Sequence, residues 1–307
     1  MRILIVGGSG FGGSGLTHEL LKRGYDVRIL DMTAPLHASL LEDVLDQIDY
    51  RWKFATDITK EDVEGCNIVL HFAAQADVPM GYLSPTWTIY NNLLGTVSVL
   101  EACKGLEVLE KVFIASSGNA VQFSKSFPIN SETPPSPRNI YGASKGCQEL
   151  IALAYYRSFG VPIVIYRNGI IYGPHMRREI FIYKWFWNML HNKPCVLEGG
   201  DQTRDPTYVT DTLDAWLLGI EADSDLVVGE TFQVSYGQEF SVKEILDYCY
   251  SISGMSRNII QKPYRPGEQG MREWFDINKA RKILGYSPKV GLAEGLAKTW
   301  DWVKSLG

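Results

Sequence analysis

One junction near the start of the chain limits its fold more than any other feature. An apolar run, Ile3–Val6, leads directly into the turn Gly7-Gly8-Ser9-Gly10-Phe11-Gly12-Gly13, and helical spacing follows over Ser14–Arg23. Glycines without a Cβ let a backbone turn sharply and approach a diphosphate, whose charge is met by free N–H groups and the positive end of the helix. The order of strand, glycine turn and helix predicts a dinucleotide site that includes Gly7, Gly10, Phe11, Gly12 and Gly13.

The first half of the chain alternates short apolar runs with longer segments of helical spacing, which is the βαβ pattern of a parallel sheet. The runs are apolar at consecutive positions, as expected for strands that helices cover on both faces. We expect strands at Ile3–Val6, Val27–Leu30, Trp52–Phe54, Ile68–Phe72, Val112–Ala115 and Pro162–Tyr166, and helices at Ser14–Arg23, Thr86–Cys103 and Tyr141–Phe159.

The second half has a different pattern, which begins after Tyr172-Gly173-Pro174. One expected helix contains Phe181, Tyr183, Trp185, Phe186 and Trp187, and we assign these rings to core or lid packing rather than to ligand stacking. No linker separates the halves, so the two parts are expected to interleave around one cleft. Further elements are a loop at Gln202–Tyr208, a strand at Phe232–Ser235, and helices at Val242–Ser251 and Leu292–Val303.

Charge and cysteine content exclude several classes of protein. The net charge of −5 gives no basic excess for binding nucleic acid. The start MRILIVGG is too short for a signal-peptide core, and no segment reaches the roughly 18 uncharged apolar residues of a membrane span. We therefore expect a cytoplasmic protein with no membrane or nucleic-acid partner. Neither a disulfide framework nor a metal site is predicted from the spacing of Cys66, Cys103, Cys147, Cys195 and Cys249.

Acidic residues follow the second and third expected strands. The Asp31 carboxylate could accept hydrogen bonds from the ribose diol of an adenosine and would repel a 2′-phosphate, which predicts NAD rather than NADP. Arg28, close by in the sequence, argues against that preference. Asp57 and Ile58 are expected at the height of the adenine ring.

A tyrosine and a lysine supply the expected chemistry. Tyr141 and Lys145 stand at i and i+4, hence on one face of a helix, where the ammonium would lower the phenol's pKa from about 10 and make it a usable general base. This spacing is common on surface helices, so its functional meaning depends on where the pair lies relative to the sheet. Ser116 and Ser117 end a strand at the edge where parallel sheets bind ligands, and Ser117 could hold the substrate oxygen as its proton leaves.

Ordered motifs continue along nearly the whole chain. They are the turn at Gly7, Gly10 and Gly13, His71-Phe72-Ala73-Ala74-Gln75, Asn92-x-x-Gly95-Thr96, Ser116-Ser117, Tyr141 with Lys145, Tyr172-Gly173-Pro174, Gly200-Asp201-Gln202-Thr203-Arg204-Asp205, Tyr208-Val209-x-Asp211, Arg265-Pro266-Gly267-Glu268, Asp276-x-x-Lys279-Ala280 and Leu284-Gly285-Tyr286-x-Pro288. Together they resemble the extended short-chain dehydrogenase/reductases, in particular NAD-dependent nucleotide-sugar epimerases and dehydratases of the UDP-glucose 4-epimerase kind.

This resemblance implies a fold, a cofactor and an assembly. The fold would be α/β, with a doubly wound parallel Rossmann sheet that binds NAD over residues 1–168, to which 207–236 return. A smaller, interleaved C-terminal domain of residues 169–206 and 237–307 would bind a nucleotide-diphosphate sugar. The protein would form a homodimer through the helices near 86–103 and 141–159.

The resemblance also implies a role for individual residues. Ser117 and Tyr141 would contact the reacting hydroxyl, and Lys145 would bind the nicotinamide ribose and tune Tyr141, which also faces the cofactor. Arg204 and Arg265 would clamp the diphosphate, to which a guanidinium presents several fixed donors. The other expected NAD contacts are Ala73, Ala74, Gln75, Asn92, Ser116 and Asn168, and the other expected substrate contacts are Val78, Gly118, Asn119 and Ile170.

Three departures from the family pattern refine the expected reaction. Dehydratases carry Thr-Asp-Glu where this chain has Ser117-Gly118-Asn119, so the acid and base that eliminate water are missing. Ala120-Val121-Gln122 replaces Val-Tyr-Gly and Gly81 replaces a serine, which suggests a reshaped or roomier sugar pocket. Arg167-Asn168-Gly169-Ile170 replaces Arg-x-x-Asn, so a pyrophosphate or sugar contact is lost.

The leading hypothesis is an NAD-dependent epimerase of a nucleotide-diphosphate sugar that acts at C4 through a 4-keto intermediate. The alternative is a 4-keto-6-deoxy nucleotide-sugar reductase, which would use the same three side chains but consume a reduced cofactor. A 4,6-dehydratase and a non-catalytic cofactor-binding protein are weaker alternatives. The base, the sugar and the carbon inverted stay open.

Overall fold

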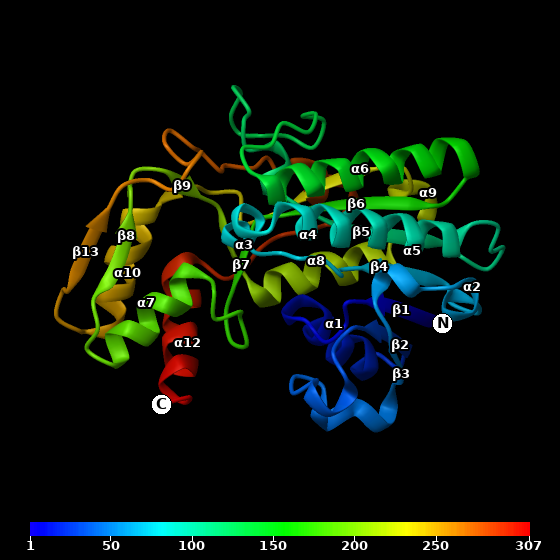
Figure 1. Ribbon diagram of the computed structural model, residues 1–307, viewed down its shortest axis with the longest axis horizontal. Coiled ribbons are helices and arrows are strands. Elements are labelled where there is room, and N and C mark those ends of the chain that lie inside the picture. Colours follow the sequence, from blue (N-terminus) through cyan, green and yellow to red (C-terminus); the bar gives the residue numbers. More distant parts are fainter.

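Seven parallel strands form the central sheet, in the order β11-β6-β5-β4-β1-β2-β3 (Figure 1). The computed structural model describes residues 1–307. Because the strand order reverses between β1 and β4, the sheet is doubly wound, and the predicted Rossmann class is confirmed. The strands are β1 (Arg2–Val6), β2 (Asp26–Asp31), β3 (Asp49–Trp52), β4 (Ile68–His71), β5 (Lys111–Ser117), β6 (Ile163–Asn168) and β11 (Thr231–Val234).

Helices cover both faces of this sheet, which explains why its strands are apolar at consecutive positions. Ile3 and Ile5 of β1 belong to the core on one face of the sheet, whereas Leu4 and Val6 belong to the core on the other face. One layer contains α1 (Phe11–Lys22), α8 (Val209–Glu221) and α11 (Asn278–Leu284), and the other contains α2 (Lys60–Val63), α5 (Gly95–Cys103) and α6 (Ile140–Phe159).

A second hydrophobic core lies beside the carboxyl edge of the sheet, on the left of Figure 1. Its helices are α7 (Phe181–Leu190), α10 (Val242–Ser253) and α12 (Leu292–Lys304), which pack beside the parallel pair β8 (Cys195–Glu198) and β13 (Ile259–Lys262). Two small strand pairs adjoin this second core. They are β7 (Ile170–Tyr172) with β10 (Pro206–Tyr208), and β9 (Thr203–Arg204) with β12 (Phe240–Ser241).

The remaining elements are short. They are α3 (Val78–Leu83), α4 (Pro85–Ile89) and α9 (Ser224–Val227), together with 3-10 turns at Pro35–His37, Glu42–Gln47, Ala55–Asp57 and Gly118–Val121. No helix of this chain combines the length and the hydrophobicity that crossing a bilayer requires.

Three expected elements differ from the structure. The third strand was expected at Trp52–Phe54 but is Asp49–Trp52, because this edge strand is partly exposed and lacks a continuous apolar run. The helix expected at Thr86–Cys103 is interrupted by a π-helical turn at Tyr90–Leu94, which consecutive apolar and amide side chains do not reveal. The loop expected at Gln202–Tyr208 contains the short strands β9 and β10.

Candidate active site

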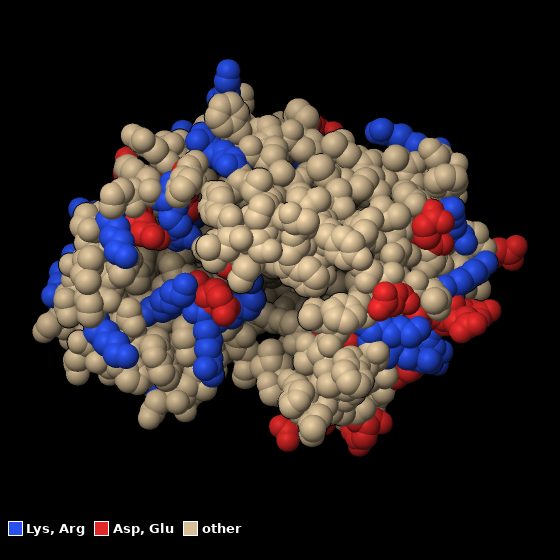
Figure 2. All heavy atoms as spheres, viewed as in Figure 1, with Lys and Arg blue, Asp and Glu red and all other residues tan.

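A cavity of about 800 Å³ opens between the carboxyl edge of the sheet and the second core. Figure 2 shows the hollow between the two parts of the molecule, with lysines and arginines gathered on the side of the second part. Most of the residues expected from sequence to bind cofactor or substrate line it. They are Gly7, Gly10, Phe11, Gly12, Gly13, Asp31, Ala73, Ala74, Val78, Ser116, Ser117, Asn119, Tyr141, Lys145, Asn168, Ile170, Arg204 and Arg265.

The glycine turn between β1 and α1 forms one end of this cavity. Gly7 has a φ of 90°, and a Cβ there would lie 2.6 Å from the backbone nitrogen of Ala73. At Gly10 a Cβ would meet nothing nearer than the Gly7 carbonyl at 3.5 Å, so the space above the turn is open. Helix α1 has no side-chain cap and no acidic residue in its first turn. Its free N–H groups and positive end fit the diphosphate of a dinucleotide.

Asp31 marks the adenosine end of the cavity. Its carboxylate accepts hydrogen bonds from the backbone N–H groups of Ser9, at 2.9 Å, and Thr33, at 2.8 Å. Arg28 points elsewhere, since its Nε lies 2.7 Å from an oxygen of Asp49 and the side chain does not line the cavity. Arg28, whose place in the sequence argued against a preference for NAD, therefore does not reach the adenosine end of the cavity.

Tyr141, Lys145 and Ser117 come together where β5 ends beside α6. Asn139 caps α6 by accepting a hydrogen bond from the Gly142 N–H, and this starts the helix so that Tyr141 and Lys145 both face the cavity. Lys145 Nζ donates to the Ala115 carbonyl at 2.8 Å and lies 5.9 Å from the centre of the Tyr141 ring. The predicted arrangement of phenol, ammonium and hydroxyl is present.

The expected effect of Lys145 on the Tyr141 phenol is wrong for the protein alone. Burial raises the pKa of Tyr141 above its ordinary value, and the Arg177 charge and the Ser117 hydroxyl oppose that rise. Burial also lowers the pKa of Lys145 to about 7, against the opposing charge of Glu149. Sequence spacing gives distance along a helix but not the cost of desolvation, which is the larger effect here.

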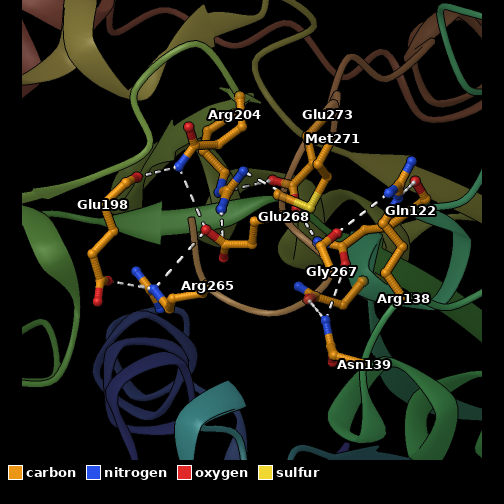
Figure 3. A network of polar contacts seen from close by, with 12 residues as sticks. Gln122, Arg138, Asn139, Glu198, Arg204, Arg265, Gly267, Glu268, Met271 and Glu273 are labelled. Carbon is orange, nitrogen blue, oxygen red and sulfur yellow. Dashed lines mark hydrogen bonds and ion pairs between the residues drawn. The ribbon is translucent and has the colours of Figure 1, made fainter. Parts of the chain in front are cut away.

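Arg204 and Arg265 lie together at the far end of the cavity, but in the company of carboxylates (Figure 3). Arg204 Nη2 lies 3.0 Å from Glu268 Oε1, and Arg265 Nε lies 3.9 Å from Glu268 Oε2. A second carboxylate, that of Glu198, lies 2.6 Å from Arg265 Nε. The two cations predicted to clamp a diphosphate therefore already have anionic partners.

Amide side chains connect this end of the cavity with Ser117, and Figure 3 shows the part around Gln122. Asn139 Nδ2 donates to Asn119 Oδ1 and to Gln122 Oε1, each at 3.0 Å, and Gln122 Nε2 donates to Glu273. Burial raises the pKa of Glu273, and the Arg204 charge opposes the shift. Sequence reasoning noticed Gln122 only as a departure from the family and missed Glu273, whose burial no sequence pattern signals.

The extra room expected at Gly81 is wrong, and Gly118 opens no space in the cavity either. A Cβ at Gly118 would overlap the ring of Phe275, which fills the space beside the glycine, and Gly118 does not line the cavity. A Cβ at Gly81 would lie 3.4 Å from the Tyr141 backbone nitrogen, in ordinary contact with α6. Both glycines accommodate neighbouring protein groups.

Four other expected cofactor contacts lie outside the cavity lining. Asp57 is exposed and Ile58 is buried behind the turn that follows β3. Asn92 and Gln75 bind each other instead, because the Gln75 N–H donates to Asn92 Oδ1 at 2.6 Å and Asn92 Nδ2 donates to the Gln75 carbonyl at 3.1 Å. Asn92 Nδ2 also donates to Ser144 of α6, so this pair supports the helix that carries Tyr141.

Several aromatic rings and cations line the cavity without having been expected there. Phe181 and Trp185 of α7 belong to the second core but also face the cavity, so the assignment to packing alone is incomplete. Arg177, Lys184 and Lys262 line it as well. In α7 the available sequence signal was Lys184 among the aromatic residues.

Comparisons with known proteins agree with this geometry. Residues 3–235 match the sequence family described as NAD dependent epimerase/dehydratase family. A Methanocaldococcus jannaschii protein with the provisional name UDP-glucose 4-epimerase is 32% identical over 99% of this chain and 98% of its own length. Human dTDP-D-glucose 4,6-dehydratase is 29% identical over 99% of this chain and 90% of its own.

A solved structure is similar over the full length of both chains. It is UDP-glucuronic acid 4-epimerase from Bacillus cereus in complex with UDP-glucuronic acid and NAD, with 29% identity and a TM-score of 0.93. The family match, the doubly wound sheet and the cavity at its carboxyl edge lead to one conclusion. The chain belongs to the NAD-dependent epimerase/dehydratase family of nucleotide-sugar enzymes.

Proposed function

We propose that this protein epimerises a nucleotide-diphosphate sugar at C4 through a 4-keto intermediate. One observation carries the proposal: Ser117, Tyr141 and Lys145 meet at the cavity, while Asn119, an amide, stands where the dehydratase pattern has an acid. Its Nδ2 donates to Ser117 Oγ at 3.3 Å, so the amide supports the hydroxyl rather than supplying a proton for elimination. NAD, the cofactor of this family, takes up and returns a hydride when bound.

The side chains would divide the proton chemistry among them. Tyr141 accepts the proton of the C4 hydroxyl, and the Arg177 charge and the Ser117 hydroxyl favour the phenolate that this step requires. Ser117 holds the reacting oxygen. Lys145, tied to the Ala115 carbonyl, binds the nicotinamide ribose.

The cavity would hold the two ligands at opposite ends. The turn of Gly7, Gly10, Phe11, Gly12 and Gly13 receives the diphosphate of NAD, Asp31 binds its ribose, and Ala73, Ala74, Ser116 and Asn168 line the rest. Asn168 has its amide satisfied by Ser116, Tyr166 and Trp216, so it supports the site by shape. Arg204 and Arg265 receive the sugar nucleotide's diphosphate, and Val78, Asn119 and Ile170 line the sugar end.

The two ends correspond to the proposed division of the chain. Residues 1–168 and 207–236 would bind the cofactor, and residues 169–206 and 237–307 would bind the sugar nucleotide. Helix α11 is an addition to this division, since Ala280 and Leu284 belong to the core under the cofactor end although they lie late in the sequence.

An apolar surface supports the proposal of a homodimer. Trp87, Tyr90, Leu94 and Leu150 are between 44% and 57% exposed on α4, the π-helical turn and α6. Helices α4 and α5 follow one another along the side of α6 in Figure 1, and Figure 2 shows few charges over them. Aromatic and aliphatic side chains at this density are typical of an interface between copies.

The thiols support a cytoplasmic location. All five cysteines are unpaired, and four of them, Cys66, Cys103, Cys195 and Cys249, are buried away from solvent. Such thiols persist in a reducing compartment.

Product analysis tests the proposed function. The purified protein, loaded with NAD, is incubated separately with UDP-glucose, UDP-glucuronic acid and dTDP-glucose that carry deuterium at C4. We expect one of them to give an isomer of unchanged mass that retains the deuterium, without added NADH. Loss of one water would establish a dehydratase, and a strict need for NADH or NADPH would establish the reductase alternative.

If water is lost, a Glu273→Gln variant shows whether Glu273 supplies the acid for that elimination. Glu273 is a buried carboxyl group that lines the cavity, and its raised pKa would let it donate a proton. Elimination that disappears in this variant would assign the missing acid to Glu273 and contradict the epimerase proposal.

A further inference from the structure

A buried ion pair lies directly behind the catalytic side chains. Glu149 of α6 is 1% exposed and Arg167 of β6 is 3% exposed. Arg167 Nε lies 2.9 Å from Glu149 Oε1, and Arg167 Nη2 lies 2.7 Å from Glu149 Oε2, so the pair is bidentate. Arg167 Nη1 also donates to the carbonyls of Ser131 and Thr133, which leaves the guanidinium well satisfied.

The same carboxylate reaches the strand that carries Ser117. Ser116 Oγ donates to Glu149 Oε1, the oxygen that Arg167 Nε also contacts. Lys145 Nζ is bound to the carbonyl of Ala115, the preceding residue of that strand. Three consecutive residues, Ala115, Ser116 and Ser117, are thus tied to Lys145, to Glu149 and to the cavity.

Glu149 also lies on the same face of α6 as Tyr141 and Lys145. It follows Lys145 by four positions and Tyr141 by eight, and side chains with this spacing share one face of a helix. The titratable or charged groups around Lys145 are Tyr141 and Glu149 on its own helix and His71 on β4, while Arg167 of β6 is paired with Glu149. His71 carries no charge near neutral pH, because burial lowers its pKa to about 3. Glu149 is therefore the anion whose charge acts on the buried Lys145.

We infer that Glu149 is a positioning residue that holds Lys145 as a cation and fixes the end of β5 through Ser116. The inference rests on the proposed function, since it assigns Lys145 its role beside Tyr141. Little water reaches this region, so a single carboxylate has a larger effect on its neighbours than it would on the surface. Because Arg167 is paired with Glu149, removing Glu149 and removing Arg167 should displace the protonation of Lys145 in opposite directions.

Two variants use this opposition as a test. Glu149→Gln removes a negative charge, which lowers the pKa of every neighbouring group, and Arg167→Met removes a positive charge, which raises it. We expect the pH profile of kcat to move by about one pH unit towards acid in Glu149→Gln and towards alkali in Arg167→Met. Glu149→Asp keeps the charge, and Glu101→Gln removes an exposed carboxylate of α5, so neither should move the profile.

A second readout does not need turnover. The dissociation constant of NAD, measured by calorimetry from pH 5.5 to 9.5, should show the same opposite displacements because Lys145 is assigned to the nicotinamide ribose. Wild-type protein that binds NAD but converts no sugar nucleotide would refute the proposed function and leave this measurement intact.

Each possible result either supports or refutes the inference. Displacements of opposite sign in the two variants support the inference, as does an unshifted Glu149→Asp. Profiles that stay in place, or move in the same direction in both variants, would make Glu149 and Arg167 a structural ion pair only. If Arg167→Met does not fold, the comparison of Glu149→Gln with Glu149→Asp decides alone.

Discussion

Glu198 Oε2 lies 2.6 Å from Nε of Arg265, so a cation assigned to the sugar nucleotide's diphosphate is already paired with an anion. About a third of each side chain is exposed, and such pairs contribute up to about 1 kcal/mol. A diphosphate must therefore compete with the Glu198 carboxylate for Arg265.

Replacing Glu198 by Gln should tighten the binding of UDP by about two- to fivefold, because up to about 1 kcal/mol of competing interaction is removed. Isothermal titration at low salt measures this. Asp247→Asn, which breaks an exposed pair with Arg257 in the same part of the molecule, should leave UDP affinity unchanged. Weaker binding in Glu198→Gln would mean that the carboxylate itself contacts the nucleotide.

Tyr141→Phe should lower kcat by roughly two to four orders of magnitude, the range for loss of general acid-base assistance. NAD and UDP affinity should be retained, because the ring still fills its buried position. Steady-state rates and titrations on one preparation measure both quantities. Near wild-type turnover of a confirmed substrate would rule out Tyr141 as the base.

Lys145→Met should stabilise the ligand-free protein at pH 6 while it abolishes activity. Burial lowers the pKa of Lys145 to about 7, so the folded state binds fewer protons than the unfolded state between pH 7 and pH 10.5. Wild-type stability therefore rises with pH across this range, and the charged lysine costs stability below it. We expect a gain of about 2 kcal/mol at pH 6, reduced by the hydrogen bond lost to Ala115.

Chemical denaturation at pH 6 and pH 9 tests this sign, since the advantage of Lys145→Met should shrink at the higher pH. Lys22→Met serves as the control, because Lys22 is exposed on α1 and should show no such dependence. A variant less stable than wild type at pH 6 would contradict the assigned cost.

Gly118→Ala should destabilise the protein by about 1 to 3 kcal/mol, because the added methyl group overlaps the Phe275 ring. Gly81→Ala is the matched control, since its Cβ on helix α3 would make an ordinary 3.4 Å contact with the Tyr141 backbone nitrogen. Urea midpoints compare the two variants. Equal stability would show that Phe275 moves away at no cost.

Leu150→Glu should convert the proposed dimer to a monomer, because a charge would enter an apolar face on α6. Light scattering after size-exclusion chromatography measures the mass. Leu36→Glu changes an even more exposed leucine in another part of the chain and should leave the mass unchanged. A monomeric wild-type protein would refute the interface.

The sequence predicts well whatever depends on local pattern. Gly7 and Asp31 lie where a strand, turn and helix in that order must place them. Tyr141 meets Ser117 because α6 begins and β5 ends at the same edge of the sheet. It predicts poorly what depends on distant neighbours. Phe275 fills the space beside Gly118 from the other end of the chain, and burial of Tyr141 outweighs the lysine one turn away. Asn92 looked like a cofactor contact because its position in a motif does not reveal that Gln75 and Ser144 use its amide.

The place of β11 in the sheet also determines when the sheet can be completed during synthesis. Residues Thr231–Val234 pair with Ile165–Asn168, although the chain builds much of the second core between them. A ribosome must therefore release more than sixty further residues after β6 before this edge is covered. Until then the nascent chain presents an apolar strand with unpaired backbone groups, which is the kind of edge that joins other chains. A fragment that ends at Asn168 would keep that edge permanently and would need a chaperone or a fused strand to stay in solution.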